Sequence, residues 1–165
     1  KICLRDRLNK FPTKDKDRCI PMLETQRLAG QFKEAASRHG QLRLSFAVAN
    51  WDLPSFAGDQ IALKKAGYSP DMAGSDKADA SDHVLKEKIY YVLSSHPEIQ
   101  VFVVGTGDGD YAEIIRTIVT SGKQVVLWAV RENTSSVYGH LLTGPERIQV
   151  EWLEDWVFAD VPPSK

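Results

Sequence analysis

The sequence has few cysteines, almost no net charge and no long hydrophobic run, and each shortage excludes a class of protein. Its two cysteines, Cys3 and Cys19, have no metal-ligand spacing and are too few for a disulfide framework. We expect reduced thiols in a cytoplasmic protein, with pairing in an oxidising compartment as the alternative. No stretch is long enough to span a bilayer, and the charged first residues do not resemble a secretory signal, so we expect no membrane contact. The formal net charge of −1 means that any basic surface for a nucleic acid has to be local.

The composition is that of one folded domain. The chain has 165 residues, of which 42% are hydrophobic and 26% are charged. A chain of this length buries a substantial core without disulfides or a structural metal. No internal repeat or second domain is visible. We therefore predict a single domain over residues 1–158 and a tail over residues 159–165.

Hydrophobic periodicity predicts helices that alternate with strands. We expect helices at residues 2–11, 22–40, 59–67, 81–96, 108–122 and 135–144. We expect strands at residues 42–49, 68–74, 99–105, 123–130 and 147–153. This order predicts the α/β class, with one parallel sheet between two layers of helices.

Two acids follow the predicted strand at residues 99–105 and are separated by one glycine. Asp108 and Asp110 lie in the segment VFVVGTGDGDYAEII, and side-by-side carboxylates repel each other unless a cation lies between them. Helix capping explains Asp108 and dipole complementation explains Asp110, but a cap accounts for one acid better than for the pair. Hard oxygen ligands of this kind suit Mg²⁺ or Mn²⁺. The glycines of this turn would also let a ligand approach the backbone.

Further acids and bases are predicted at the same edge of the sheet, because the carboxyl ends of parallel strands gather there. Asp79 and Asp82 lie near the start of the predicted helix at 81–96, and Asp82 could approach Asp108 and Asp110. Helix capping explains either acid equally well. Lys77, and Arg131 with the polar residues 133–136 after a later strand, could touch phosphates; ordinary solvated charge is the alternative.

Several segments resemble one family. The segment VFVVGTGDGDYAEIIRTIVTSGKQVVLWAV resembles the strand–SGDGDF–helix–GK–strand signature of NYN domains, the LabA-like branch of the PIN-like nucleases. KADASDHVLKEKI resembles the preceding helix of that family, and LSFAVANWD and IALKKAGYSP resemble its earlier strand, helix and turn. The resemblance covers roughly residues 22–156, and GTGDGDY is its specific part.

The resemblance implies a three-layer α/β/α fold and a Mg²⁺- or Mn²⁺-dependent ribonuclease site that acts on RNA. By position, Asp108 and Asp110 match the two acids of the turn, and Thr106 matches the hydroxyl residue before them. Asp82 is the best match for the helix acid, and Asp79 is its rival. A homo-oligomer, or a fused or partner domain, is compatible with the resemblance.

One departure from the family pattern separates two functions. The family's first strand ends in an Asp that is followed three residues later by an Asn, and the given sequence has no such strand before its first helix. If that strand precedes Lys1 in the natural protein, the site is complete and we expect an enzyme. If the strand is absent, we expect a PIN-like module that binds RNA or a protein without cleavage.

Overall fold

The computed structural model describes residues 22–53, 56, 58–74, 80–142 and 148–157. These residues fall into two compact units, an amino-terminal unit up to Val92 and a carboxy-terminal unit from Leu93. The predictions that lie outside the described residues are the helix at 2–11, Cys3, Cys19, Lys77, Asp79 and the tail at 159–165. Among the described helices, none combines the length and the hydrophobicity that crossing a membrane requires.

The amino-terminal unit contains two parallel strands and three helices. Its elements are α2 (Met22–Ser37), β1 (Phe46–Ala49), α3 (Asp59–Lys65), β2 (Ser69–Met72) and α4 (Ala80–Ser95), whose last turn enters the other unit. β1 and β2 pair in parallel, with Phe46 opposite Ser69. Thr25 of α2 donates a hydrogen bond to Asp59 of α3 at 2.7 Å, and the small buried residues Ala29 and Ala62 let the two helices approach closely.

An ion pair and an indole hydrogen bond meet at β2 in this unit. Lys88 of α4 lies 3.0 Å from the carboxylate of Asp71, and Trp51 donates its indole N–H to the Asp71 carbonyl at 2.8 Å. The Trp51 ring also meets Phe56 edge-on. These contacts give Trp51 a packing role at the end of β1.

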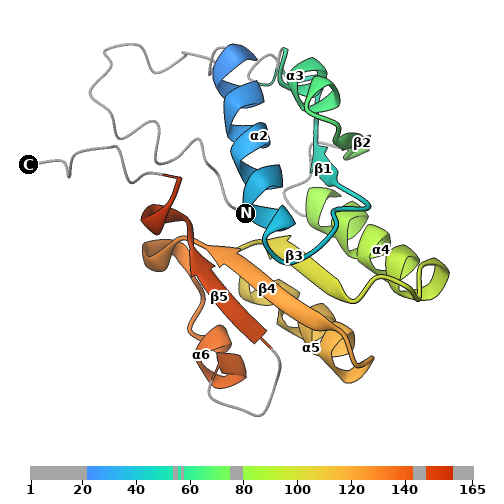
Figure 1. The fold of residues 1–165 in the computed structure, drawn as a ribbon, viewed down its shortest axis with the longest axis vertical. Helices are drawn as coiled ribbons and strands as arrows, with labels where there is room; N and C mark the ends of the chain where they lie inside the picture. Colours follow the sequence, from blue (N-terminus) through green and yellow to red (C-terminus); the bar gives the residue numbers. More distant parts are fainter. Residues whose placement is uncertain (1–21, 54–55, 57, 75–79, 143–147, 158–165) are drawn as a thin grey trace, which may run out of the picture. The chain divides into compact units, whose positions relative to one another are not determined.

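The carboxy-terminal unit is built on a three-stranded parallel sheet of order β3-β4-β5 (Figure 1). Its elements are β3 (Val101–Gly105), η2 (Gly109–Tyr111), α5 (Ala112–Thr120), β4 (Gln124–Ala129), η3 (Arg131–Asn133), α6 (Val137–Leu142), β5 (Ile148–Trp152) and η4 (Leu153–Asp155). Each strand is followed by a helix or a turn, as the connections between parallel strands require. The predicted α/β class with parallel strands is confirmed, and the strands pair in two sheets, one in each unit.

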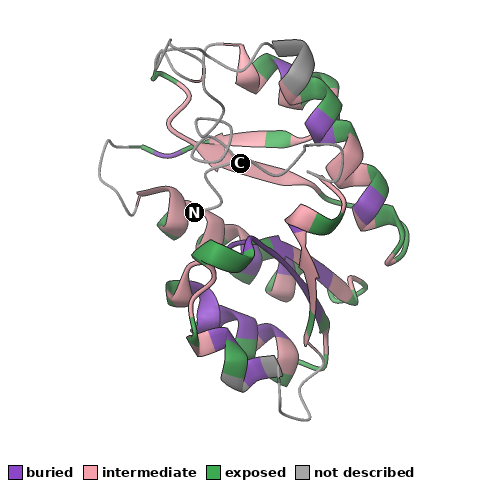
Figure 2. Ribbon diagram, turned by 90° about the vertical axis from the view of Figure 1, so that its left-hand side faces the viewer, coloured by how far each residue is buried: buried purple, intermediate pink, exposed green. Residues whose placement is uncertain are grey.

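The core of this unit lies between α5 and the sheet. Ile115 and Ile118 of α5 and Leu127 of β4 are completely buried, and Figure 2 shows buried residues concentrated in the helices and strands of this unit. The apolar residues of α5 recur at helical spacing on one face, which explains why this helix covers the sheet. The strand ends and loops of this unit project from this packed core.

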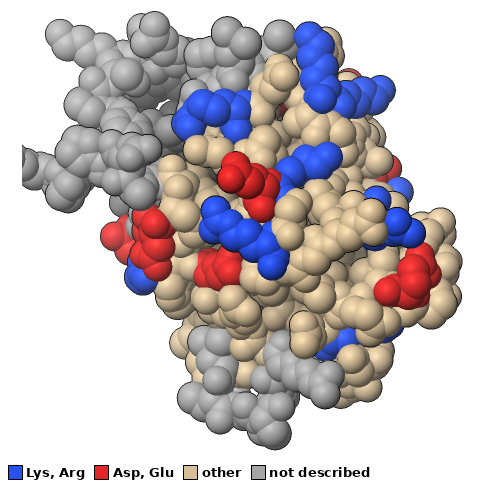
Figure 3. Space-filling model, in the orientation of Figure 1, with Lys and Arg blue, Asp and Glu red and all other residues tan. Residues whose placement is uncertain are grey.

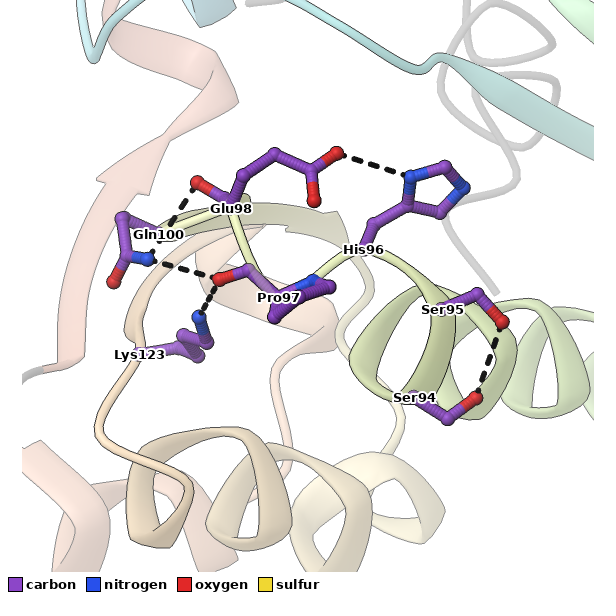
Figure 4. Close-up of polar contacts among 7 residues, drawn as sticks. All are labelled: Ser94, Ser95, His96, Pro97, Glu98, Gln100 and Lys123. Carbon is purple, nitrogen blue, oxygen red and sulfur yellow. Dashed lines mark hydrogen bonds and ion pairs between the residues drawn. The ribbon is translucent and has the colours of Figure 1, made fainter.

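The opposite, amino-terminal edge of the same sheet is closed by a small polar network (Figure 4). The Pro97 carbonyl accepts hydrogen bonds from Lys123 at 2.6 Å and from Gln100 at 3.1 Å. His96 lies 3.1 Å from Glu98 in the same turn. Because Gln100 precedes β3 and Lys123 precedes β4, this network fixes where the two strands begin.

Candidate functional site

The turn at residues 106–111, here called the acid turn, leaves the sheet at the carboxyl end of β3. Thr106 begins it and is 1% exposed. The Thr106 backbone N–H donates to the carbonyl of Trp128 in β4 at 3.0 Å, and its hydroxyl accepts from the Asp108 N–H at 3.1 Å. The first residue of the turn is therefore tied to the neighbouring strand, and Asp108 is tied to that first residue.

The two carboxylates of the acid turn have different surroundings. Asp108 is the N-cap of η2, and its Oδ1 accepts the Asp110 N–H at 3.0 Å. The capping role predicted for Asp108 is therefore confirmed. Asp110 is exposed, and its carboxylate has no hydrogen bond or ion pair within the described part of the chain. Capping explains the first acid, and the place of Asp110 in the first turn of η2 gives its charge the smaller stabilisation of complementing the helix dipole.

The segment at residues 133–138 covers one side of the acid turn. The Ser135 N–H donates to the Gly107 carbonyl at 2.8 Å. A Cβ at Gly107 would lie 2.5 Å from the Asn133 carbonyl oxygen, and one at Gly109 would lie 2.7 Å from the Ser135 hydroxyl. The glycines therefore permit a close approach of the chain to itself, and the space that we had expected a ligand to use beside them is filled.

Tyr138 of α6, the last residue of this segment, also contacts the acid turn. Its side chain is 1% exposed, and its hydroxyl donates a short hydrogen bond to the Asp108 backbone carbonyl. Burial, followed by the negative charges of Asp108 and Asp110, raises the pKa of Tyr138. The phenol is therefore neutral at physiological pH and acts as a donor to the acid turn.

Arg131, after β4, is paired with an acid. Its guanidinium binds both carboxylate oxygens of Asp155 at 2.8 Å and lies 5.1 Å from the centre of the Trp152 ring. The Arg131 N–H donates to Glu154 at 2.9 Å. The hydrogen bond between the two side chains lowers the pKa of Asp155 and raises the pKa of Arg131. A phosphate would share this guanidinium with Asp155.

The Arg131–Asp155 pair gives a pH-dependent prediction. Because the folded state lowers the pKa of Asp155 below its ordinary value of 3.8, the pair stabilises the protein above that pH and stops doing so as the pH falls through the lowered value. Asp155→Asn is expected to lower the thermal midpoint slightly at neutral pH, since both side chains are exposed. Thermal melts of both proteins should converge in strong acid, and a difference that grows there would contradict the pair.

The other predicted site residues are not part of the acid turn. Asp82 lies in the first turn of α4, in the amino-terminal unit, and Lys77 and Asp79 are outside the described residues. Among the residues that the structure describes, no three His, Cys, Asp or Glu side chains form a group that could hold a metal ion. The described chain thus brings together Thr106, Asp108 and Asp110 in one turn.

The donor set of the acid turn fits a hydrated divalent cation. Asp110 offers both carboxylate oxygens, and Asp108 offers the oxygen that does not cap η2. These are hard ligands, and Mg²⁺ keeps several of its waters, so a pair of carboxylates is enough to anchor it. Sequence reasoning found this pair and missed Tyr138, which lies 30 residues from Asp108. The one signal for Tyr138 in the sequence was its position in a predicted helix that follows β4, the strand beside β3.

Parallel strands, alternating helices and an acidic turn where a strand ends are typical of PIN-like nuclease domains. The family model of the NYN domain matches residues 12–139, which is most of the chain. The chain therefore belongs to the NYN domain family, and its fold is PIN-like. No curated protein and no solved structure matches it.

Proposed function

We propose that this protein is a ribonuclease that cleaves RNA phosphodiester bonds at the acid turn with the help of Mg²⁺ or Mn²⁺. The observation that carries the proposal is the unpaired, exposed carboxylate of Asp110 beside the Asp108 cap, within the described part of an NYN domain. Neighbouring like charges cost free energy, and such groups gather at functional sites.

Each proposed residue has one task. Asp108 and Asp110 would hold the cation. A bound cation lowers the pKa of its water and neutralises negative charge on the phosphate. Thr106 is buried, which favours a role in holding the backbone of the acid turn over contact with RNA. Lys77 and Arg131 would bind phosphates of the RNA.

The charge of the carboxy-terminal unit supports a need for a cation. Its described residues include eight acids (Glu98, Asp108, Asp110, Glu113, Glu132, Glu151, Glu154 and Asp155) and three bases (Arg116, Lys123 and Arg131). On the face shown in Figure 3, Lys and Arg are interspersed with Asp and Glu. A polyanion such as RNA would be repelled by an acidic unit unless a divalent cation offset its charge.

The proposal is tested by measuring cleavage of a fluorescent single-stranded RNA by the full chain. We expect cleavage with Mg²⁺ or Mn²⁺, its loss in EDTA, and its return when the cation is added in excess. A single-stranded DNA of the same sequence, used in parallel, measures the preference for RNA. Equal cleavage with and without EDTA would contradict the proposed role of the cation.

The second candidate is a module that binds RNA or a protein without cleavage. It is favoured by the finding that the described residues contain no group of three metal-ligating side chains. This candidate expects RNA to bind with salt-dependent affinity and to remain intact with either cation. Intact RNA after prolonged incubation with a saturating amount of protein would therefore replace the first candidate by the second.

A further inference from the structure

Four hydrogen bonds hold Asp108 through its backbone and its side chain. Its N–H donates to the Thr106 hydroxyl at 3.1 Å, and its carbonyl accepts from the Tyr111 N–H at 3.2 Å. The same carbonyl accepts the Tyr138 hydroxyl, and the side chain accepts the Asp110 N–H. Of these partners, only Tyr138 comes from outside the acid turn.

The contact from Tyr138 helps to hold the acid turn in place, together with the hydrogen bonds of Thr106 to Trp128 and of Ser135 to Gly107. The ring is buried in α6, and the Tyr138 N–H donates to the Ser135 carbonyl at 3.2 Å, while the Ser135 N–H donates to Gly107 at 2.8 Å. Ser135, just before α6, and Tyr138 within α6 therefore contact two carbonyls of the acid turn, those of Gly107 and Asp108. The first contact uses backbone atoms that any residue supplies, whereas the second requires a phenol hydroxyl.

We propose that Tyr138 is a positioning residue for a cation site, because its hydroxyl fixes the Asp108 peptide and thereby directs the Asp108 and Asp110 carboxylates toward one bound ion. The inference rests on the proposed function. Tyr138 is buried and contacts the backbone of Asp108, a proposed ligand of the cation. It therefore acts through Asp108 and has no contact with RNA. Hydrogen bonds that orient metal ligands in this way affect ion affinity strongly.

The test compares Tyr138→Phe with Tyr68→Phe in the full chain. Both changes remove a phenol hydroxyl that donates to a backbone carbonyl, and the Tyr68 hydroxyl lies 3.4 Å from the Ala29 carbonyl in the amino-terminal unit. Mn²⁺ binding is measured directly from the loss of the electron paramagnetic resonance signal of free Mn²⁺. We expect Tyr138→Phe to weaken binding by about tenfold and Tyr68→Phe to leave it unchanged.

A second measurement separates positioning from a loss of fold. Hydrogen exchange followed by mass spectrometry should show faster exchange in peptides that cover the acid turn of Tyr138→Phe, with unchanged protection of α5. In the wild type, Mg²⁺ should shift the ring-carbon resonance of Tyr138 more than that of Tyr68. This comparison needs no substitution and stands even if Tyr138→Phe fails to fold.

The outcomes distinguish the inference from the function that it rests on. Wild-type Mn²⁺ affinity in Tyr138→Phe, together with loss of binding in Asp110→Asn, would overturn the positioning role and leave the cation site standing. Absence of Mn²⁺ binding by the wild type would overturn both. Equal weakening in Tyr138→Phe and Tyr68→Phe would show a general effect on stability and would also overturn the inference.

Discussion

The double change Asp108→Asn, Asp110→Asn is expected to reduce cation-dependent RNA cleavage by more than about 100-fold, the upper range found when groups that merely support metal ligands are removed. Asparagine keeps the shape of aspartate, and its carbonyl oxygen can still accept the N–H of residue 110 that Asp108 accepts at 3.0 Å. The cap therefore survives while both negative charges are lost. Initial cleavage rates at saturating Mn²⁺ measure the effect.

A measurement of thermal stability and a control variant at a neighbouring acid make this prediction specific. The thermal midpoint of the double variant is expected to equal or exceed that of the wild type, because two neighbouring like charges have been removed. Glu113→Gln is the control, since Glu113 is an exposed acid in the first turn of α5, three residues after Asp110. Glu113→Gln should cleave RNA at the wild-type rate. Wild-type activity in the double variant would remove the acid turn from the mechanism.

The order of the elements could be predicted from the sequence, whereas several of their ends could not. The period of the apolar residues identified α5 and β4, which are buried on one or both faces. The strand predicted at 42–49 is shorter in the structure, where β1 begins at Phe46. Within the described residues, β2 supplies only four pairing residues, and the apolar alternation before Phe46 has no partner strand.

The sequence predicted the part of the candidate site whose residues lie close together along the chain. Asp108 and Asp110 could be found because a buried strand, a glycine turn and a helix follow one another within a few residues. Tyr138 contacts a residue 30 positions away in the sequence, and Asp155 contacts one 24 positions away. The hydrophobic pattern of a sequence does not indicate which distant residues meet. The same limit explains why Gly107 was expected to face a ligand.

Gly107→Ala is expected to destabilise the protein by about 1–3 kcal/mol, the usual cost of forcing an extra methyl group into filled space. The added Cβ would lie 2.5 Å from the Asn133 carbonyl oxygen, and that oxygen belongs to the backbone and cannot rotate away. The segment at residues 133–135 must then separate from the acid turn, which breaks the 2.8 Å hydrogen bond between Ser135 and Gly107. Urea denaturation measures the loss in the free energy of unfolding.

Gly30→Ala is the matched control, since it adds the same methyl group in the middle of α2, where no atom lies within 4 Å of the new Cβ. An exposed helix interior favours alanine over glycine by roughly 1 kcal/mol, so this variant should be more stable than the wild type. Gly107→Ala should in addition bind Mn²⁺ more weakly, because the Asp108 peptide moves with the turn. A change of the same sign in the free energy of unfolding of both variants would show that the close approach at Gly107 does not hold the acid turn and the segment at residues 133–138 together.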